Sequence, residues 1–416
     1  MAAALGNSLG YSVPLVEAHR HGSPRVVVVS NRLTTGGAER HLTHILPELR
    51  ARGLEIELFV LERGGDLEAA LAASGVPISG PLRRAGRAMH LLVAAWALYR
   101  QIRRKRPDVL HFFLPESYLV GGIVAAVAGH RICLMSRRSL SHYHLNHPWL
   151  ARLERQLHRR MTALLGNSQA VVDELVNEAG DNRKIGLIHN GVVVPPPIDE
   201  HSRALQRTRL DLPADAFVMM IVANLIHYKG HSDLLNALGL VAAKLPQPWR
   251  LVVVGRDEGI GPQLKLQADR LNLNPNILWL GARSDVEAIL PTADLGLLVS
   301  HQEGFSNALL EAMGQGLPTI ATAIGGNLDA IVDGQSGWLV PAQDPMRLGE
   351  VILEVALNPA AREAMGLAAR ERTTALFSTA DCVTRYERLY RGFRELPLRP
   401  VQAVIDGIDF AGTSAN

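Results

Sequence analysis

Short runs of aliphatic residues alternate with helical patterns along most of this 416-residue chain, and the alternation starts afresh after a triple proline at residues 195–197. The first run, Val26 to Val29, is continuously β-branched, which is typical of a strand buried on both faces of a parallel sheet. Alternating strands and helices fold as doubly wound α/β layers. The restart therefore predicts two doubly wound, Rossmann-like α/β domains.

The pattern also predicts where the elements lie. Strands are expected at residues 26–29, 56–60, 109–113, 132–135, 185–188, 218–222, 251–254, 277–280, 295–299 and 319–321. A long helix is expected from about Met89 to Arg106, where Pro107 ends it, and another from about Trp149 to Leu165. Because ligands of such sheets bind beyond the carboxyl ends of the strands, the loops that follow the strands are the expected site.

Charge and cysteine content narrow the class of protein. Lys and Arg number 43 and Asp and Glu 40, and this net charge of +3 does not favour a nucleic-acid partner. Cys133 and Cys382 are too few for a disulfide framework or a four-ligand zinc site, which favours a reducing cytoplasm. The residues up to Glu17 lack a secretory signal pattern, and the apolar run from Tyr118 to Gly129 is shorter than the roughly 20 residues that span a bilayer. We therefore expect a cytoplasmic protein, soluble or peripheral to a membrane.

The segment over residues 303–313, which reads EGFSNALLEAM, carries the most chemistry. A strand leads into it, and a helix is predicted to begin near Ser306, a favourable N-cap residue. The unpaired N–H groups at such a helix start, here those of Phe305, Ser306 and Asn307, attract an anion such as a diphosphate.

Two glutamates bracket this helix start. Glu303 lies in the loop, where its carboxylate can accept hydrogen bonds from sugar hydroxyls, and Glu311 lies just over one turn into the helix, within reach of a ribose diol. Gly304 leaves room for a ligand or for backbone. The alternative is a solvated helix face with an ordinary cap.

This stretch resembles the family-4 retaining glycosyltransferases of the GT-B fold, in which an E-G-F-x-N-x-x-x-E-A-M segment binds the nucleotide sugar. Every fixed position of that segment is met. The resemblance extends from about Arg25 to Phe393.

The resemblance implies that the two domains face each other across a cleft and bind different substrates. Residues 24–195 would form the acceptor-side domain, residues 196–375 would bind a nucleoside-diphosphate sugar, and a helix over 376–396 would cross back to the first domain. Asn190 and Gly191 match the family's turn into the linker, a structural role. Residues 1–23 are expected to be a flexible leader and residues 397–416 a tail.

The donor diphosphate has further candidate ligands. Gly36 and Gly37, directly after the first strand, are similar to the family's glycine loop that closes on the diphosphate. Lys229 matches the lysine that pairs with the diphosphate, but Asn224 stands where the family has an arginine. Arg256, in the loop after the next strand, is the candidate substitute; the alternative is a surface arginine on a turn.

On the acceptor side, many family members use a histidine after the strand that here ends near Met135. Residues 136–139 read SRRS instead, so that role cannot be carried over. Arg137 and Arg138 are the candidates to face the cleft, and His111 is a further one.

We expect no metal cofactor. The chain contains no D-x-D triplet, and Lys229 with the helix amides can balance the charge of a leaving phosphate. His142, His144 and His147 cluster in one loop, for which a wet polar loop is favoured over a metal site.

Residues 83–106 are basic and contain no acid, and they surround an apolar span that includes Met89, Leu92 and Trp96. The favoured interpretation is a core-packed helix with a solvated basic end. The alternative is a surface that binds an anionic membrane, on which a lipid-linked acceptor would lie.

The expected reaction moves a hexosyl unit from a nucleoside-diphosphate sugar to a hydroxyl of a saccharide or lipid-linked acceptor, with retention, as in bacterial surface polysaccharide assembly. A nicotinamide oxidoreductase is disfavoured because neither Gly36-Gly37 nor residues 255–261 have the G-x-G-x-x-G spacing. The remaining alternative is a sugar-nucleotide-binding protein whose transferase site has decayed.

Overall fold

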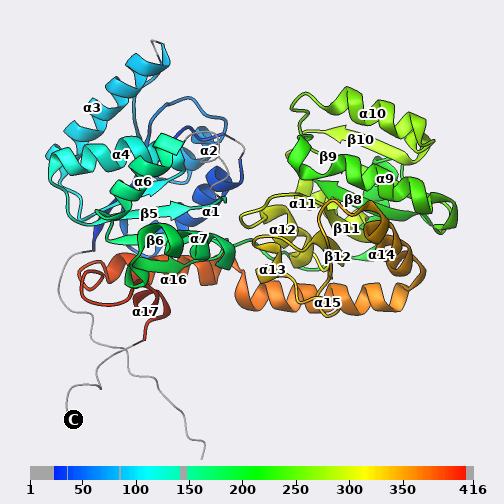
Figure 1. Cartoon of the computed structure of the whole chain (residues 1–416). Coiled ribbons are helices and arrows are strands. Elements are labelled where there is room, and N and C mark those ends of the chain that lie inside the picture. Colours follow the sequence, from blue (N-terminus) through cyan, green and yellow to red (C-terminus); the bar gives the residue numbers. More distant parts are fainter. Residues whose placement is uncertain (1–22, 35, 84–85, 141–147, 409–416) are drawn as a thin grey trace, which may run out of the picture.

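The computed structural model describes residues 23–34, 36–83, 86–140 and 148–408, and it forms two α/β domains, each built on a parallel sheet (Figure 1). The expected leader falls almost wholly outside these residues, as do the histidines of the loop at 141–147. The predicted fold class, two doubly wound Rossmann-like domains, is confirmed. None of the helices in the described part of the chain is long and apolar enough to cross a membrane.

The N-terminal sheet has seven strands in the order β3-β2-β1-β4-β5-β6-β7. These strands are β1 (Arg25–Ser30), β2 (Glu55–Val60), β3 (Ile78–Ser79), β4 (Val109–Phe113), β5 (Cys133–Arg137), β6 (Ala163–Gly166) and β7 (Ile185–Leu187). The helices of this half are α1 (Gly37–Ala51), α2 (Glu68–Ala73), α3 (Arg87–Lys105), α4 (Pro115–Ala128), α6 (Pro148–His158) and α7 (Gln169–Ala179).

The C-terminal sheet has six strands in the order β10-β9-β8-β11-β12-β13. These strands are β8 (Phe217–Val222), β9 (Trp249–Val254), β10 (Ile277–Gly281), β11 (Leu295–Leu298), β12 (Thr319–Thr322) and β13 (Trp338–Val340). The α-helices that follow the linker are α8 (Glu200–Arg209), α9 (His231–Val241), α10 (Gly261–Arg270), α11 (Val286–Ile289), α12 (Asn307–Gly314), α13 (Asn327–Ala330), α14 (Pro345–Leu357), α15 (Pro359–Leu376), α16 (Thr379–Arg391) and α17 (Val401–Asp406).

Strand β1 is buried because helices cover both faces of its sheet. Val26 and Val28 pack into the core cluster that includes residues of α1 and α16, whereas Val27 and Val29 pack into the cluster that includes residues of α3 and α4. Successive side chains of a strand point to opposite faces, so a four-valine run serves both clusters.

The predicted helix from Trp149 to Leu165 is wrong in its second half. Helix α6 ends at His158, where the N–H of Met161 bonds the carbonyl of His158, and the exposed residues 159–160 form a turn. The apolar run that follows is β6, a buried strand. A short apolar run bounded by polar residues fits a strand or a helix end, so periodicity alone does not separate them.

The chain passes between the domains twice, and the two passes lie side by side. The N–H of Val192 donates to the carbonyl of Phe377 (2.9 Å), and the N–H of Thr379 donates to the carbonyl of Val192 (3.0 Å). Beyond this point α16 and α17 return to the N-terminal domain (Figure 1). Tyr386 and Tyr390 complete its core, and so do Val401 and Ile405 of α17, a helix within the segment expected to be a tail. A side chain at Gly191 would place its Cβ 2.7 Å from the Cβ of Cys382, so the close approach requires glycine.

Candidate functional site

A cleft of ≈ 1210 Å³ lies between the two domains and is lined by the loops that follow the strands of both sheets. The predicted site residues that line it are Gly36, Gly37, Arg137, Arg138, Asn224, Lys229, Arg256, Glu303, Gly304, Phe305, Ser306, Asn307 and Glu311. The structure thus brings together residues that are up to 275 positions apart, from Gly36 to Glu311.

Helix α12 begins at the cleft, as the sequence predicts. The side chain of Ser306 accepts a hydrogen bond from the N–H of Leu309 (3.3 Å), which makes Ser306 the N-cap. The N–H groups of the first helical residues, Asn307 and Ala308, have no partner within the helix by the geometry of a helix start. The cleft therefore faces the positive end of the helix dipole.

Lys229 and Glu303 form an ion pair inside the cleft. The Nζ of Lys229 donates to Oε1 of Glu303 (2.5 Å), and the Oγ of Ser300 donates to the same oxygen (2.7 Å). The lysine is held by a tight turn at Gly230, where φ is +71° and an added Cβ would lie 1.9 Å from the carbonyl oxygen of Val299. Only glycine fits this turn, so the backbone itself fixes Lys229 opposite Glu303.

Glu311 lines the same cleft and is partly buried. Burial raises the pKa of its carboxyl to about 7; nearby Arg40 opposes this shift and Glu287 adds to it. Arg40 lies in the first turn of α1 and lines the cleft from the opposite domain. Glu311 is therefore protonated in a substantial fraction of molecules at neutral pH and can both donate and accept hydrogen bonds.

Arg256 lies at the rim of the cleft and is engaged by a neighbour. Its guanidinium donates to Oε1 of Glu258 (2.6 and 2.9 Å) and is 62 % exposed. The side chain of Asn224 accepts a hydrogen bond from the N–H of Arg256 (3.2 Å). Asn224 thus orders the loop that carries Arg256.

A polar network joins the two domains across the cleft. Asn190 donates to Oδ1 of Asn307 (2.6 Å) and to the carbonyl of Phe305 (3.0 Å), and Asn307 donates to the carbonyl of Gly37 (3.2 Å). Arg138 donates in turn to Oδ1 of Asn190. The sequence predicts only a structural turn at Asn190. Its position after β7, beside the linker, is the one sequence signal that it could contact the second domain.

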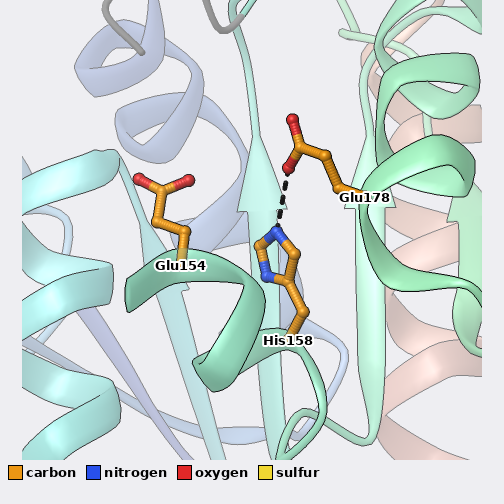
Figure 2. A group of neighbouring side chains, drawn as sticks. All are labelled: Glu154, His158 and Glu178. Carbon is orange, nitrogen blue, oxygen red and sulfur yellow. Dashed lines mark hydrogen bonds and ion pairs between the residues drawn. The ribbon is translucent and has the colours of Figure 1, made fainter. Parts of the chain in front are cut away.

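The two arginines after β5 have different surroundings. The guanidinium of Arg137 pairs with Glu178 (2.7 Å) and with Glu154 (3.0 Å). His158 bonds Glu178 at 3.1 Å (Figure 2). Burial by itself raises the pKa of Glu178, but the hydrogen bonds from His158 and Arg137 bring it down to about 2. Arg137 is therefore committed to this cluster, although it borders the cleft.

Glu154, His158 and Glu178 offer three ligand atoms within 4.8 Å of one another, a set that suits a metal ion by residue type (Figure 2). The Arg137 guanidinium already supplies positive charge to both carboxylates of this set. The cluster is thus a buried ion-pair network between α6, α7 and the end of β5.

His111 belongs to β4 of the N-terminal domain, but it does not reach the cleft, as a residue that contacts the acceptor would have to. It is fully buried, with its ring nitrogens 2.8 Å from the hydroxyl oxygens of Tyr390 and Ser136, and it does not line the cleft. Burial, with a smaller contribution from Arg138, lowers the pKa of His111 to about 3. The reason is α16, which returns over β4 and covers this ring.

The domains touch directly at Gly304. An added Cβ on Gly304 would lie 2.6 Å from the carbonyl oxygen of Arg138 and 2.9 Å from Cα of Ser139. Nearby, Asp329 of α13 accepts hydrogen bonds from the N–H of Gln169 (2.7 Å) and from His189 (3.0 Å). The described conformation is therefore one in which the two domains are in contact across the site.

Comparison with known proteins covers most of the chain. A family model described as "Glycosyltransferase Family 4" matches residues 35–194, and one described as "Glycosyl transferases group 1" matches residues 202–372. The chain is 26 % identical to a D-inositol 3-phosphate glycosyltransferase of Streptomyces avermitilis, over 86 % of this chain and 84 % of that protein. It is 28 % identical to an N-acetyl-alpha-D-glucosaminyl L-malate synthase of Bacillus anthracis over 42 % and 45 % of the two chains.

The fold has close counterparts among solved structures. The Anabaena protein HepE, in complex with UDP and glucose, superimposes with a TM-score of 0.78 at 19 % identity, covering 87 % of this chain and 98 % of HepE. At this identity the likeness concerns the architecture.

Proposed function

Because the chain belongs to the family-4 glycosyltransferases of the GT-B fold, we propose that it moves a hexosyl unit from a nucleoside-diphosphate sugar to a hydroxyl of a saccharide or lipid-linked acceptor, with retention of configuration. The observation that carries the proposal is the Lys229–Glu303 pair at the start of α12, inside a cleft that both domains line. UDP bound to HepE supports a nucleotide sugar as the donor.

The donor's parts match distinct features of the cleft. The diphosphate would lie against the N–H groups that begin α12, with Lys229 beside it and the loop at Gly36 and Gly37 opposite. Glu303 would hold the sugar ring, and Glu311 would bind the ribose diol. Closure of the domains over this donor excludes water, which favours transfer over hydrolysis.

In the proposed reaction, the bond between the anomeric carbon and the diphosphate oxygen breaks while the acceptor oxygen bonds that carbon on the same face. The acceptor proton passes to the leaving phosphate oxygen. Negative charge grows on the phosphate, and Lys229 with the α12 amides would stabilise it without a metal ion.

Arg138 is the proposed acceptor-side residue. Of the three candidates, His111 is buried in the core and Arg137 is committed to two carboxylates, whereas Arg138 lines the cleft and bonds Asn190, which contacts the start of α12. Action at the cytoplasmic face of a membrane, in surface polysaccharide assembly, is part of this proposal.

A screen of UDP, GDP and ADP sugars by thermal shift, followed by turnover, tests the proposed function. One nucleotide class should raise the melting temperature, because a ligand bound only by the folded state stabilises it. Purified protein should then hydrolyse that sugar slowly or transfer it, and Glu303→Ala should abolish both. Binding without any turnover, with or without saccharide acceptors, would instead indicate a non-catalytic sugar-nucleotide-binding protein.

A further inference from the structure

Helix α3 exposes a stripe of large apolar side chains. Met89, Leu92, Val93 and Trp96 are 58 %, 66 %, 47 % and 61 % exposed, and they are spaced as one face of a helix. The opposite face, formed by His90, Ala94, Leu98 and Ile102, is the one that packs on the domain. The favoured expectation that the apolar span packs in the core is therefore wrong for these four residues and holds for Leu98.

The same face continues as a basic surface. Arg100, Arg103 and Arg104 are exposed, and at 100° per residue they fall within the same arc of about 120° as the apolar stripe. Helix α3 contains no acidic residue. In the described part of the chain, the ion pairs of α3 join Arg87, His90 and Lys105 to carboxylates, and none of them involves these three arginines.

The position of α3 leaves this face free. Helix α3 lies at the outer edge of the N-terminal domain, and its N-terminal end reaches beyond the rest of that domain (Figure 1). The stripe from Met89 to Arg104 is about 22 Å long at 1.5 Å per residue. Apolar side chains followed by unpaired arginines on one exposed face suit the boundary between acyl chains and anionic headgroups.

We propose that this face of α3, defined by Met89, Leu92, Val93, Trp96, Arg100, Arg103 and Arg104, binds an anionic lipid bilayer. The apolar half enters the interface, and the three arginines contact lipid phosphates. This inference deepens the proposed function, since it names the surface that would bring the cleft to a lipid-linked acceptor, but binding itself requires no transferase activity.

A second copy of the chain is the competing occupant, and the charge pattern disfavours it. In a two-fold symmetric pairing of this face, either the apolar half of one copy meets the basic half of the other, or the arginines of both copies converge. An anionic bilayer complements both halves at once.

Vesicle sedimentation of the full chain tests the proposal. The probes are phosphatidylcholine vesicles and vesicles with about 30 % phosphatidylglycerol, which carry a negative surface. Wild type should bind the anionic vesicles, and binding should weaken as salt rises. Arg100→Gln/Arg103→Gln/Arg104→Gln should weaken it about a hundredfold, since the loss of each arginine near the surface raises the dissociation constant about fivefold.

The apolar half is tested separately with Leu92→Ser/Trp96→Ser, which should weaken binding at least tenfold at roughly unchanged charge. The matched control is Leu240→Ser/Met346→Ser, which removes two similarly exposed apolar side chains (58 % and 67 %) from the C-terminal domain and should bind like wild type. Unchanged melting temperatures establish that all variants fold.

Three outcomes overturn the proposal: wild type that does not bind anionic vesicles at low salt, α3 variants that bind as well as wild type, or α3 variants that change a monomer–dimer equilibrium while vesicle binding stays the same. A wild-type protein that binds anionic vesicles but neither hydrolyses nor transfers any sugar nucleotide would count against the proposed function alone.

Discussion

The amine of Lys229 lies 2.5 Å from Oε1 of Glu303, an oxygen that also accepts a hydrogen bond from Ser300. A cation assigned to the donor's diphosphate is thus paired with the carboxylate assigned to the donor's sugar. Binding of a donor would replace part of this pair with phosphate contacts, so that a single lysine links the two halves of the substrate.

Replacing Lys229 with Ala is expected to lower the rate of transfer at least a hundredfold, because the developing phosphate charge loses its cation. Initial rates with the donor identified by thermal shift measure this. Lys265→Ala, on α10 and outside the cleft lining, is the control and should keep its rate. A Lys229→Ala enzyme with wild-type turnover would remove the lysine from the mechanism.

The raised pKa of Glu311 predicts a pH-dependent loss of stability. Below about pH 4 its carboxyl is protonated in both the folded and unfolded chain. Between pH 4 and the folded value of about 7, the unfolded chain ionises first, so the free energy of unfolding falls as pH rises, by up to about 3 kcal/mol. Glu311→Gln should lack this fall, and chemical unfolding at pH 5 and pH 8 measures the difference.

The control for that experiment is Glu350→Gln, whose side chain is 58 % exposed and pairs with Arg347 on the same helix. It should follow the wild-type pH profile. Equal pH profiles for wild type and Glu311→Gln would show that the carboxyl is ionised as easily in the folded chain as in the unfolded one.

Gly304→Ala should impair the approach of the two domains, because its Cβ would meet the backbone of Arg138 at 2.6 Å. We expect about a hundredfold slower transfer, since misplacement of the reacting groups by about 1 Å has that effect. X-ray scattering should also show a larger radius of gyration. Gly314→Ala is the control, because its nearest neighbours lie at 3.6 Å; equal rates for the two variants would contradict the prediction.

Arg137→Met should destabilise the fold by about 3–5 kcal/mol, because it leaves the buried carboxylate of Glu154 and that of Glu178 without their shared cation. Denaturant unfolding measures this, with exposed Arg160→Met as the control that should stay near wild type.

Arg138→Lys, which keeps the charge but loses the planar fork, should instead affect transfer more than stability. The reverse pattern would exchange the roles assigned to the two arginines.

Both cysteines should be inert in the folded protein. Burial raises the pKa of the Cys133 and Cys382 thiols to about 12, so neither forms a thiolate at neutral pH. A chromogenic disulfide reagent at pH 8 should label neither thiol in the native protein and both after unfolding. Rapid labelling of the native protein would show that α16, which carries Cys382, opens readily.

Much of the fold could be predicted because the residue types of several segments favour the same local structure that the packed domain requires. The valine run of β1 is buried on both faces, and Ser306 is the cap of α12, as their residue types indicate. The surroundings of His111 could not be predicted, because the hydroxyl that binds it comes from Tyr390, 279 residues later. The same holds for Arg137, whose acidic partners lie on two later helices, and for α3, where apolar spacing does not say which face meets the core.

The two segments that connect the domains are hydrogen-bonded to each other at Val192 and Thr379. Because both connections between the domains lie at this one place, any relative rotation of the domains would pivot there. In that case a substrate would enter the cleft from the side away from these connections. The close packing of Gly304 on the backbone of Arg138 would set the closed position of such a rotation.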